Sequence, residues 1–224
     1  QTCALPIFIN KEYSALQYHI TPNKNSEIAV ENYLDGDVAN KDSNYDEKFW
    51  LCVKQETHQD SLFVTVKTKK LDWLVSNAIA FEIYKNGRIH PCHGKPHTQD
   101  KFASNTYHLA VAANEKLTLV KHCITGSSFH HAPDALDLHV KKALEKMSAS
   151  HFEDHLKMSA AAWAKKWETT DVRIDGDVKA QQAVRFNIYH LNQTYCGDDA
   201  RLNIGPKGFT GEKYGGSTRS EEHT

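Results

Sequence analysis

The side chains best suited to chemistry stand in one glycine-rich run, GPKGFTGEKYGG. Lys207, Thr210, Glu212 and Tyr214 supply donors and acceptors that can orient sugar hydroxyls or hold an anion, and dense glycine lets the backbone approach a ligand closely. The run fits neither common phosphate motif, because Glu212 follows Gly211 where GxxxxGK[ST] needs Lys and the spacing fails GxGxxG. These residues alone leave two possibilities open, a polar binding loop or a plain connection between helices.

Histidine is the next residue type that could do chemistry, with 14 copies in the chain. The segment HPCHGKPH contains four capable zinc ligands, but its Gly and Pro exclude the helical HxxxH arrangement, so we predict a surface loop. Those ligands are His90, Cys92, His93 and His97. The pair His130-His131 before Pro133 indicates a solvated linker. NKDSNYDEKF alternates oxygen ligands but lacks the Gly and the terminal Glu of a calcium loop. We therefore predict no metal site.

Composition excludes several classes of partner. The chain has 224 residues and a formal net charge of −1, so it carries no electrostatic footprint for nucleic acid or for an anionic membrane. No apolar run approaches the roughly 20 residues of a membrane helix. The five cysteines are scattered without a CxxC pair, which indicates free thiols in a reducing compartment, and hence a cytoplasmic protein. They are Cys3, Cys52, Cys92, Cys123 and Cys196.

The first seven and the last six residues match the translation of a DNA adapter. One common sequencing-library adapter encodes the terminal RSEEHT in one orientation and the initial QTCALPI in the other. We therefore predict that residues 1–7 and 219–224 are translated adapter, and we exclude them from fold reasoning as one would exclude a tag.

The elements that must position these residues begin with strands. SLFVTVKT alternates cleanly, with Leu62, Val64 and Val66 on one face, and Asn86-Gly87 between apolar runs is a strong hairpin signal. Further β-rich runs are ALQYHI, EIAVENYL and YHLAVAANEKLTLVKHCI. Several antiparallel strands with turns between them predict a β-sandwich.

The hydrophobic period then changes to that of helices. Pro133 suits the first turn of a helix whose apolar stripe is Leu136, Val140, Leu144 and Met147. A second helix has the stripe Phe152, Leu156, Trp163 and Trp167. Asp177 can cap a third, whose stripe is Val184, Ile188, Leu191 and Tyr195. The predicted order is therefore a sandwich, a helical connector and the beginning of an all-helical region.

Two stretches near the end of the chain resemble a known family. AQQAVRFNIYHLNQTY, followed by RLNIGPKGFTGEKYGGST, closely resembles the inverting disaccharide phosphorylases of glycoside hydrolase family 65, within them the maltose phosphorylase branch. YLDGDVANKDSNYDEKFW resembles the same branch. The resemblance implies a galactose-mutarotase-like β-supersandwich, an α-helical linker and the first helix of a truncated (α/α)6 barrel. The implied boundaries are 8–130 for part of the sandwich, 131–170 for the linker and 171–218 for the start of the catalytic barrel.

The resemblance also implies a reaction, the phosphorolysis of maltose to glucose and β-glucose 1-phosphate with inversion. Inorganic phosphate is then a co-substrate and no cofactor is needed. A carboxylic acid protonates the glycosidic oxygen while phosphate takes the place that water holds in an inverting hydrolase. The full-length protein is expected to be a homodimer whose ligands are a disaccharide and phosphate. The alternatives are a sister enzyme acting on trehalose, kojibiose or nigerose, and a sandwich that only binds carbohydrate.

The resemblance places the loop from Lys207 to Gly216 at the mouth of the sugar pocket, so Lys207, Thr210, Glu212 and Tyr214 are its predicted substrate-binding residues. In the family, the run after GGST carries a Trp and an Asp that contact glucose, whereas RSEEHT stands there in this chain. The general acid and the phosphate site of the family lie further downstream. We therefore assign no catalytic residue and expect this chain to be inactive by itself.

Overall fold

The computed structural model describes residues 2–6, 11–39, 48–194, 197 and 199–201. It divides into two units, residues 1–38 with 49–162 and residues 39–48 with 163–224. In the described part, no helix is long and apolar enough to cross a membrane.

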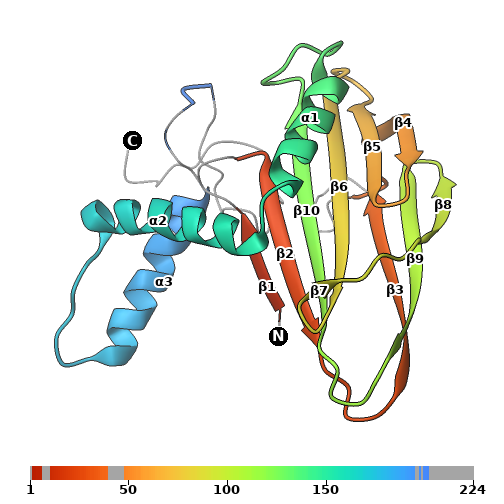
Figure 1. The fold of residues 1–224 in the computed structure, drawn as a ribbon. Helices are drawn as coiled ribbons and strands as arrows, with labels where there is room; N and C mark the ends of the chain where they lie inside the picture. Colours follow the sequence, from red (N-terminus) through yellow and green to blue (C-terminus); the bar gives the residue numbers. More distant parts are fainter. Residues whose placement is uncertain (1, 7–10, 40–47, 195–196, 198, 202–224) are drawn as a thin grey trace. The chain divides into compact units, whose positions relative to one another are not determined.

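The first unit is built from two antiparallel sheets (Figure 1). The larger has the strand order β1-β2-β10-β6-β5-β4, with β7 paired to β6, and the smaller has the order β3-β9-β8. The larger sheet contains β1 (Thr2–Pro6), β2 (Tyr13–Ile20), β4 (Trp50–Thr57), β5 (Ser61–Thr68), β6 (Leu74–Lys85), β7 (Arg88–Ile89) and β10 (Leu117–Ser127). The smaller contains β3 (Ser26–Asp35), β8 (Lys95–Gln99) and β9 (Phe102–Val111). This arrangement confirms the predicted β-sandwich.

Alternation along the strands produces the core between the sheets. Leu62, Val64 and Val66 are all buried there, which confirms the face predicted for β5. Phe81 of β6 packs against Tyr107 of β9, with ring centroids 5.2 Å apart. Residues of the opposite parity therefore point to the other face of the larger sheet.

The β6–β7 hairpin turns at Asn86 and Gly87, as predicted. Both residues have positive φ angles, 49° and 79°, which is the two-residue turn that Asn-Gly favours. The Asn86 side chain also accepts a hydrogen bond from the backbone of Lys116 at 2.9 Å, and this bond ties the hairpin to the start of β10.

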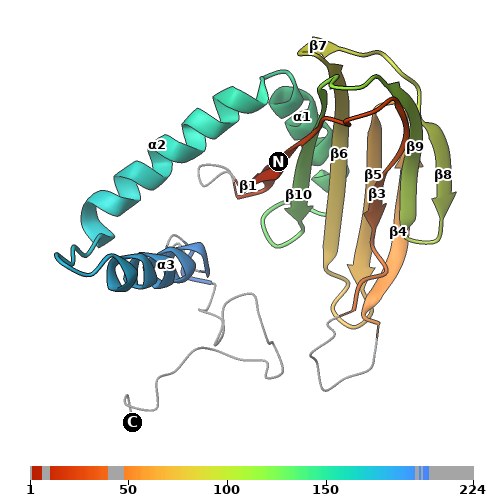
Figure 2. The same cartoon turned by 90° about the horizontal axis from the view of Figure 1, so that it is seen from below.

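Helix α1 (Leu136–Ser148) covers the other face of the larger sheet, over β10 and β6 (Figures 1 and 2). Its predicted stripe is confirmed, because Leu136, Val140 and Leu144 are buried against Tyr13, Ala78, Val120 and Ile124. Gly126 of β10 permits this close docking, since a Cβ there would lie 2.8 Å from a methyl carbon of Val140. The predicted start was wrong: Ala135 is the N-cap, so Pro133 precedes the helix.

The second unit contains the later part of helix α2 (Phe152–Thr170) and the whole of helix α3 (Val178–Thr194). Asp177 caps α3 as predicted, because its Oδ1 accepts hydrogen bonds from the backbone N–H groups of Lys179 and Ala180, both at 3.0 Å. Arg185 of α3 forms a two-pronged ion pair with Asp171, at 2.8 and 2.7 Å. These contacts order the connection between the two helices.

Three segments have a structure that the sequence did not predict. Thr2–Pro6, assigned to translated adapter, pairs with β2 as a strand, and its origin stays a prediction. His97 lies in β8, an exposed edge strand within the segment predicted as a loop. His131, predicted to be solvated, has a side chain that is only 25% exposed and is hydrogen-bonded to Glu12.

Candidate functional site

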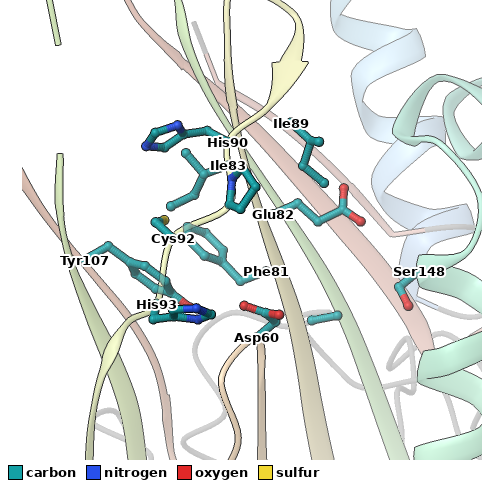
Figure 3. Close-up of a pocket in the computed structure, with 12 residues that line it drawn as sticks. Asp60, Phe81, Glu82, Ile83, Ile89, His90, Cys92, His93, Tyr107 and Ser148 are labelled. Carbon is teal, nitrogen blue, oxygen red and sulfur yellow. The ribbon is translucent and has the colours of Figure 1, made fainter. Parts of the chain in front are cut away.

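The predicted substrate-binding residues Lys207, Thr210, Glu212 and Tyr214 lie outside the described residues. The candidate site that the structure does describe is a pocket of about 350 Å³ at the edge of β6 (Figure 3).

The pocket forms because β6 is longer than its neighbour. β5 pairs with β6 only as far as Ser61 opposite Ala80, and the next part of the β6 edge faces the loop after β7. Two backbone hydrogen bonds frame the opening, from Phe81 N–H to the Asp60 carbonyl at 2.9 Å and from His90 N–H to the Ile83 carbonyl at 2.7 Å. The hairpin at Asn86-Gly87 thus turns the chain back over this edge.

The lining combines an apolar floor with polar walls. The apolar side chains are those of Ala80, Phe81, Ile83, Ile89 and Pro91. The polar ones are those of Asp60, Glu82, His90, Cys92, His93, Tyr107 and Ser148. In Figure 3, the imidazole of His93 and the carboxylate of Asp60 are drawn on the same side of the pocket, below Phe81.

Burial and charge set the protonation of two lining groups. Burial, with a further contribution from the Asp60 carboxylate, raises the pKa of Tyr107 to about 12. The same two causes raise the pKa of the Cys92 thiol, so this cysteine is neutral rather than a reactive thiolate. Tyr107 is also engaged, since its hydroxyl donates to the Gln59 carbonyl at 3.2 Å.

Such a lining suits polar binding better than aromatic stacking. Phe81 and Tyr107 are only 8% and 2% exposed as whole residues, so neither offers a free ring face to a sugar. Carboxylates at Asp60 and Glu82 with two imidazoles can instead accept and donate hydrogen bonds to hydroxyl groups. Sequence reasoning singled out His90, Cys92 and His93 but missed Asp60, which lies far from them along the chain, and Glu82, which the β6–β7 hairpin brings to the same pocket.

A separate group of titratable side chains lies fully buried beneath the helices. The Tyr13 hydroxyl bonds to Nδ1 of His122 at 2.5 Å, and the rings of His122 and His155 meet edge to face with centroids 5.7 Å apart. Burial, reinforced by the charge of His155, lowers the pKa of His122 from 6.5 to about 4. His122 is therefore neutral at physiological pH and belongs to the core.

Sequence comparisons cover most of the chain. The profile of "Glycosyl hydrolase family 65, N-terminal domain" matches residues 8–166, and that of "Glycosyl hydrolase family 65 central catalytic domain" matches residues 185–219. A maltose phosphorylase of Bacillus subtilis is 35% identical over 190 residues, which are 85% of this chain and 25% of that protein. A kojibiose phosphorylase of Caldanaerobacter subterraneus is 27% identical over 92% of this chain and 28% of its own length.

Comparison with solved structures agrees on the fold. A putative kojibiose phosphorylase from the human microbiome has a TM-score of 0.81 and 19% sequence identity, and the match covers 92% of this chain and 26% of that one. The chain thus spans about a quarter of the length of the relatives that it matches.

Proposed function

Because the chain belongs to glycosyl hydrolase family 65, we propose that it is part of an inverting disaccharide phosphorylase, with maltose as the substrate. One observation carries the choice of substrate: identity is 35% to a maltose phosphorylase but 27% to a kojibiose phosphorylase. An α,α-trehalose phosphorylase of Geobacillus stearothermophilus is 39% identical, but over only 72 residues. Maltose is therefore favoured over kojibiose and trehalose.

In the proposed reaction, an enzyme carboxylic acid donates its proton to the glycosidic oxygen of maltose and glucose leaves. Phosphate attacks the anomeric carbon from the opposite face, so the α-linkage becomes β-glucose 1-phosphate. Phosphate is the nucleophile and the acid supplies the proton, so the reaction needs no cofactor.

The described residues form the parts of the proposed enzyme that lie outside its catalytic centre. The sandwich and α1 form a packed unit, and α3 begins the catalytic domain. Phe186 and Leu191 on α3 are strongly exposed here, and Leu191 is 70% exposed. Apolar side chains of this kind fit a helix that packs against further helices of an (α/α)6 barrel.

We assign no catalytic residue in this chain, and we propose that the 224-residue chain has no phosphorylase activity by itself. The loop from Lys207 to Gly216 is proposed to reach the sugar pocket of the complete enzyme, with Glu212 as its best polar contact. The complete enzyme is proposed to be a cytoplasmic homodimer.

The deciding experiment uses the complete gene. Purified enzyme, maltose and phosphate should release glucose and β-glucose 1-phosphate, with the anomer assigned by NMR of the first turnovers. Kojibiose, nigerose and trehalose, offered at the same concentration, should react more slowly. A faster reaction with one of them would replace maltose as the substrate, and release of free sugars without phosphate would identify a hydrolase.

A second role for the sandwich is favoured by the pocket at the β6 edge, namely carbohydrate binding without catalysis. Titrating the chain with maltose, and following amide resonances near Asp60 and His93, tests this role. Maltose binding should shift these resonances until they saturate. In the Asp60→Asn variant, which keeps the side-chain volume, saturation should need a higher maltose concentration. Shifts that stay linear up to high sugar concentration would rule this role out.

A further inference from the structure

Three polar side chains from distant parts of the sequence meet outside the pocket. Glu12 precedes β2, His131 follows β10 and His139 lies on α1. The Glu12 carboxylate bonds to both imidazoles, through Oε1 to Nε2 of His131 at 2.6 Å and through Oε2 to Nε2 of His139 at 2.7 Å. Each of the three side chains can give one atom to a metal ion, and these three atoms all lie within 4.8 Å of one another.

Backbone hydrogen bonds fix each of the three positions. The Glu12 carbonyl accepts from Thr125 N–H at 2.8 Å, and His131 N–H donates to the Ser127 carbonyl at 3.1 Å. His139 is held within its helix by a bond from its N–H to the Ala135 carbonyl at 2.9 Å. The groups are therefore presented by a turn beside β2, a bend after β10 and helix α1, each tied down by a backbone hydrogen bond, which is the support that a binding site needs.

The two imidazole rings are stacked, with centroids 3.7 Å apart and an angle of 25° between their planes. Burial raises the pKa of Glu12, but hydrogen bonds from His139 and His131 outweigh it, and the net pKa is lowered. The cluster thus gathers one carboxylate and two imidazoles at a single place.

Two histidines and a glutamate, with one position left open, form a donor set that zinc accepts. Zinc binds imidazole nitrogen at about 2.0–2.1 Å and carboxylate oxygen at about 2.0–2.2 Å, so atoms that share one ion lie roughly 3.3 Å apart. To admit an ion at that spacing, the two Nε2–Oε pairs need to separate by less than about 1 Å, and the stacked rings need to tilt so that both Nε2 lone pairs point at the ion. The three side chains are between 20% and 36% exposed, so an ion can reach them and keep a water as its fourth ligand.

We propose that Glu12, His131 and His139 form a Zn²⁺ site that fastens helix α1 to the sandwich. The sequence predicted no metal site because these ligands lie 119 and 127 positions from Glu12, without the close spacing of a zinc motif. The site takes no part in the proposed reaction and does not depend on it.

Calorimetry and thermal unfolding of the chain, stripped of metal by a chelator and titrated with ZnCl2, test the proposal. We expect one strong equivalent of zinc, and a melting temperature raised by about 5–10 °C when free zinc exceeds Kd about 100-fold. His139→Gln and His131→Gln should each weaken this equivalent at least about tenfold. The matched control is His108→Gln on the exposed face of β9, which should bind as the unaltered chain does.

The separate histidines of HPCHGKPH are a possible source of weaker binding, so a His90→Gln, His93→Gln double variant is included and should keep the strong equivalent. Co²⁺ bound to the unaltered chain provides a measurement that needs no variant to fold, because low-coordinate Co²⁺ absorbs visible light far more strongly than the hydrated ion. A spectrum like that of hydrated Co²⁺, or a strong zinc equivalent that persists in His139→Gln, would overturn the proposal.

Discussion

Lowering the pH should destabilise the sandwich through the buried His122. The folded state lowers the pKa of His122 from 6.5 to about 4. In the unfolded chain, His122 therefore binds a proton near pH 6.5, whereas in the folded chain it binds one only near pH 4. The stability that neutral His122 contributes is present above pH 6.5 and is lost as the pH falls toward 4.

The size of the effect follows from that interval. At 1.36 kcal/mol per pKa unit, the complete loss is about 3 kcal/mol, and about 2 kcal/mol of it falls between pH 7.5 and 5.0. Hydrogen bonds from Lys141 and Lys54 lower the pKa of Glu56 to about 2. The stability that ionised Glu56 contributes is therefore lost only below pH 4.5, outside this window. The measurement is urea unfolding followed by tryptophan fluorescence at both pH values.

His122→Asn isolates the histidine, because asparagine does not titrate and its side-chain oxygen can still accept the Tyr13 hydroxyl proton. The variant should be less stable at pH 7.5 but lose much less further stability at pH 5.0. His108→Asn, on the exposed face of β9, should lose as much as the unaltered chain. If His122→Asn keeps the full dependence on pH, the assignment to the buried histidine is wrong.

Three further predictions concern single positions. In the complete enzyme, Glu212→Gln should lower kcat/KM by about one to two orders of magnitude at unchanged melting temperature, since it removes a charge-assisted hydrogen bond of about 1.5–3 kcal/mol; normal kinetics would place Glu212 outside the sugar site. Asp177→Ala should destabilise α3 by about 1 kcal/mol because the helix loses its N-cap, whereas Asp177→Asn should keep the cap. If the two variants lose far-UV helicity at the same temperature, the cap does not contribute this stability. Gly126→Ala should cost about 1–3 kcal/mol because its Cβ meets Val140, and adding Val140→Ala should recover part of that loss in urea unfolding rather than add to it.

Local patterns predicted much of the fold. The stripe on α1, the face of β5, the Asn86-Gly87 turn and the Asp177 cap each depend on a few neighbouring residues, so their period or identity was enough. Strands β4 and β8 were missed. β4 contains a bulge between Cys52 and Lys54, which breaks the two-residue alternation that would have revealed it.

The sites were harder to predict because they join segments far apart in the chain. The pocket brings Asp60 and Ser148 to the same edge of β6, and Glu12 meets histidines that follow it by more than a hundred positions. Such pairings depend on strand order and helix docking, which no local period records. The loop around Glu212 was singled out by its composition and its resemblance, and its place in a sugar pocket stays a prediction.

The packing of α1 decides where this chain could be divided. Strand patterns end near residue 130, yet the outer face of the larger sheet is completed by Leu136, Val140 and Leu144 of α1 and by Phe152 of α2. A protein cut at residue 130 would expose Tyr13, Val120 and Ile124 to water, and it would aggregate or recruit another apolar surface. A cut directly after α1 would still remove Phe152, a member of the same cluster, and His155, whose ring packs against Tyr13. Anyone wishing to transplant the sandwich as an independent module should therefore carry α1 and the first part of α2 with it.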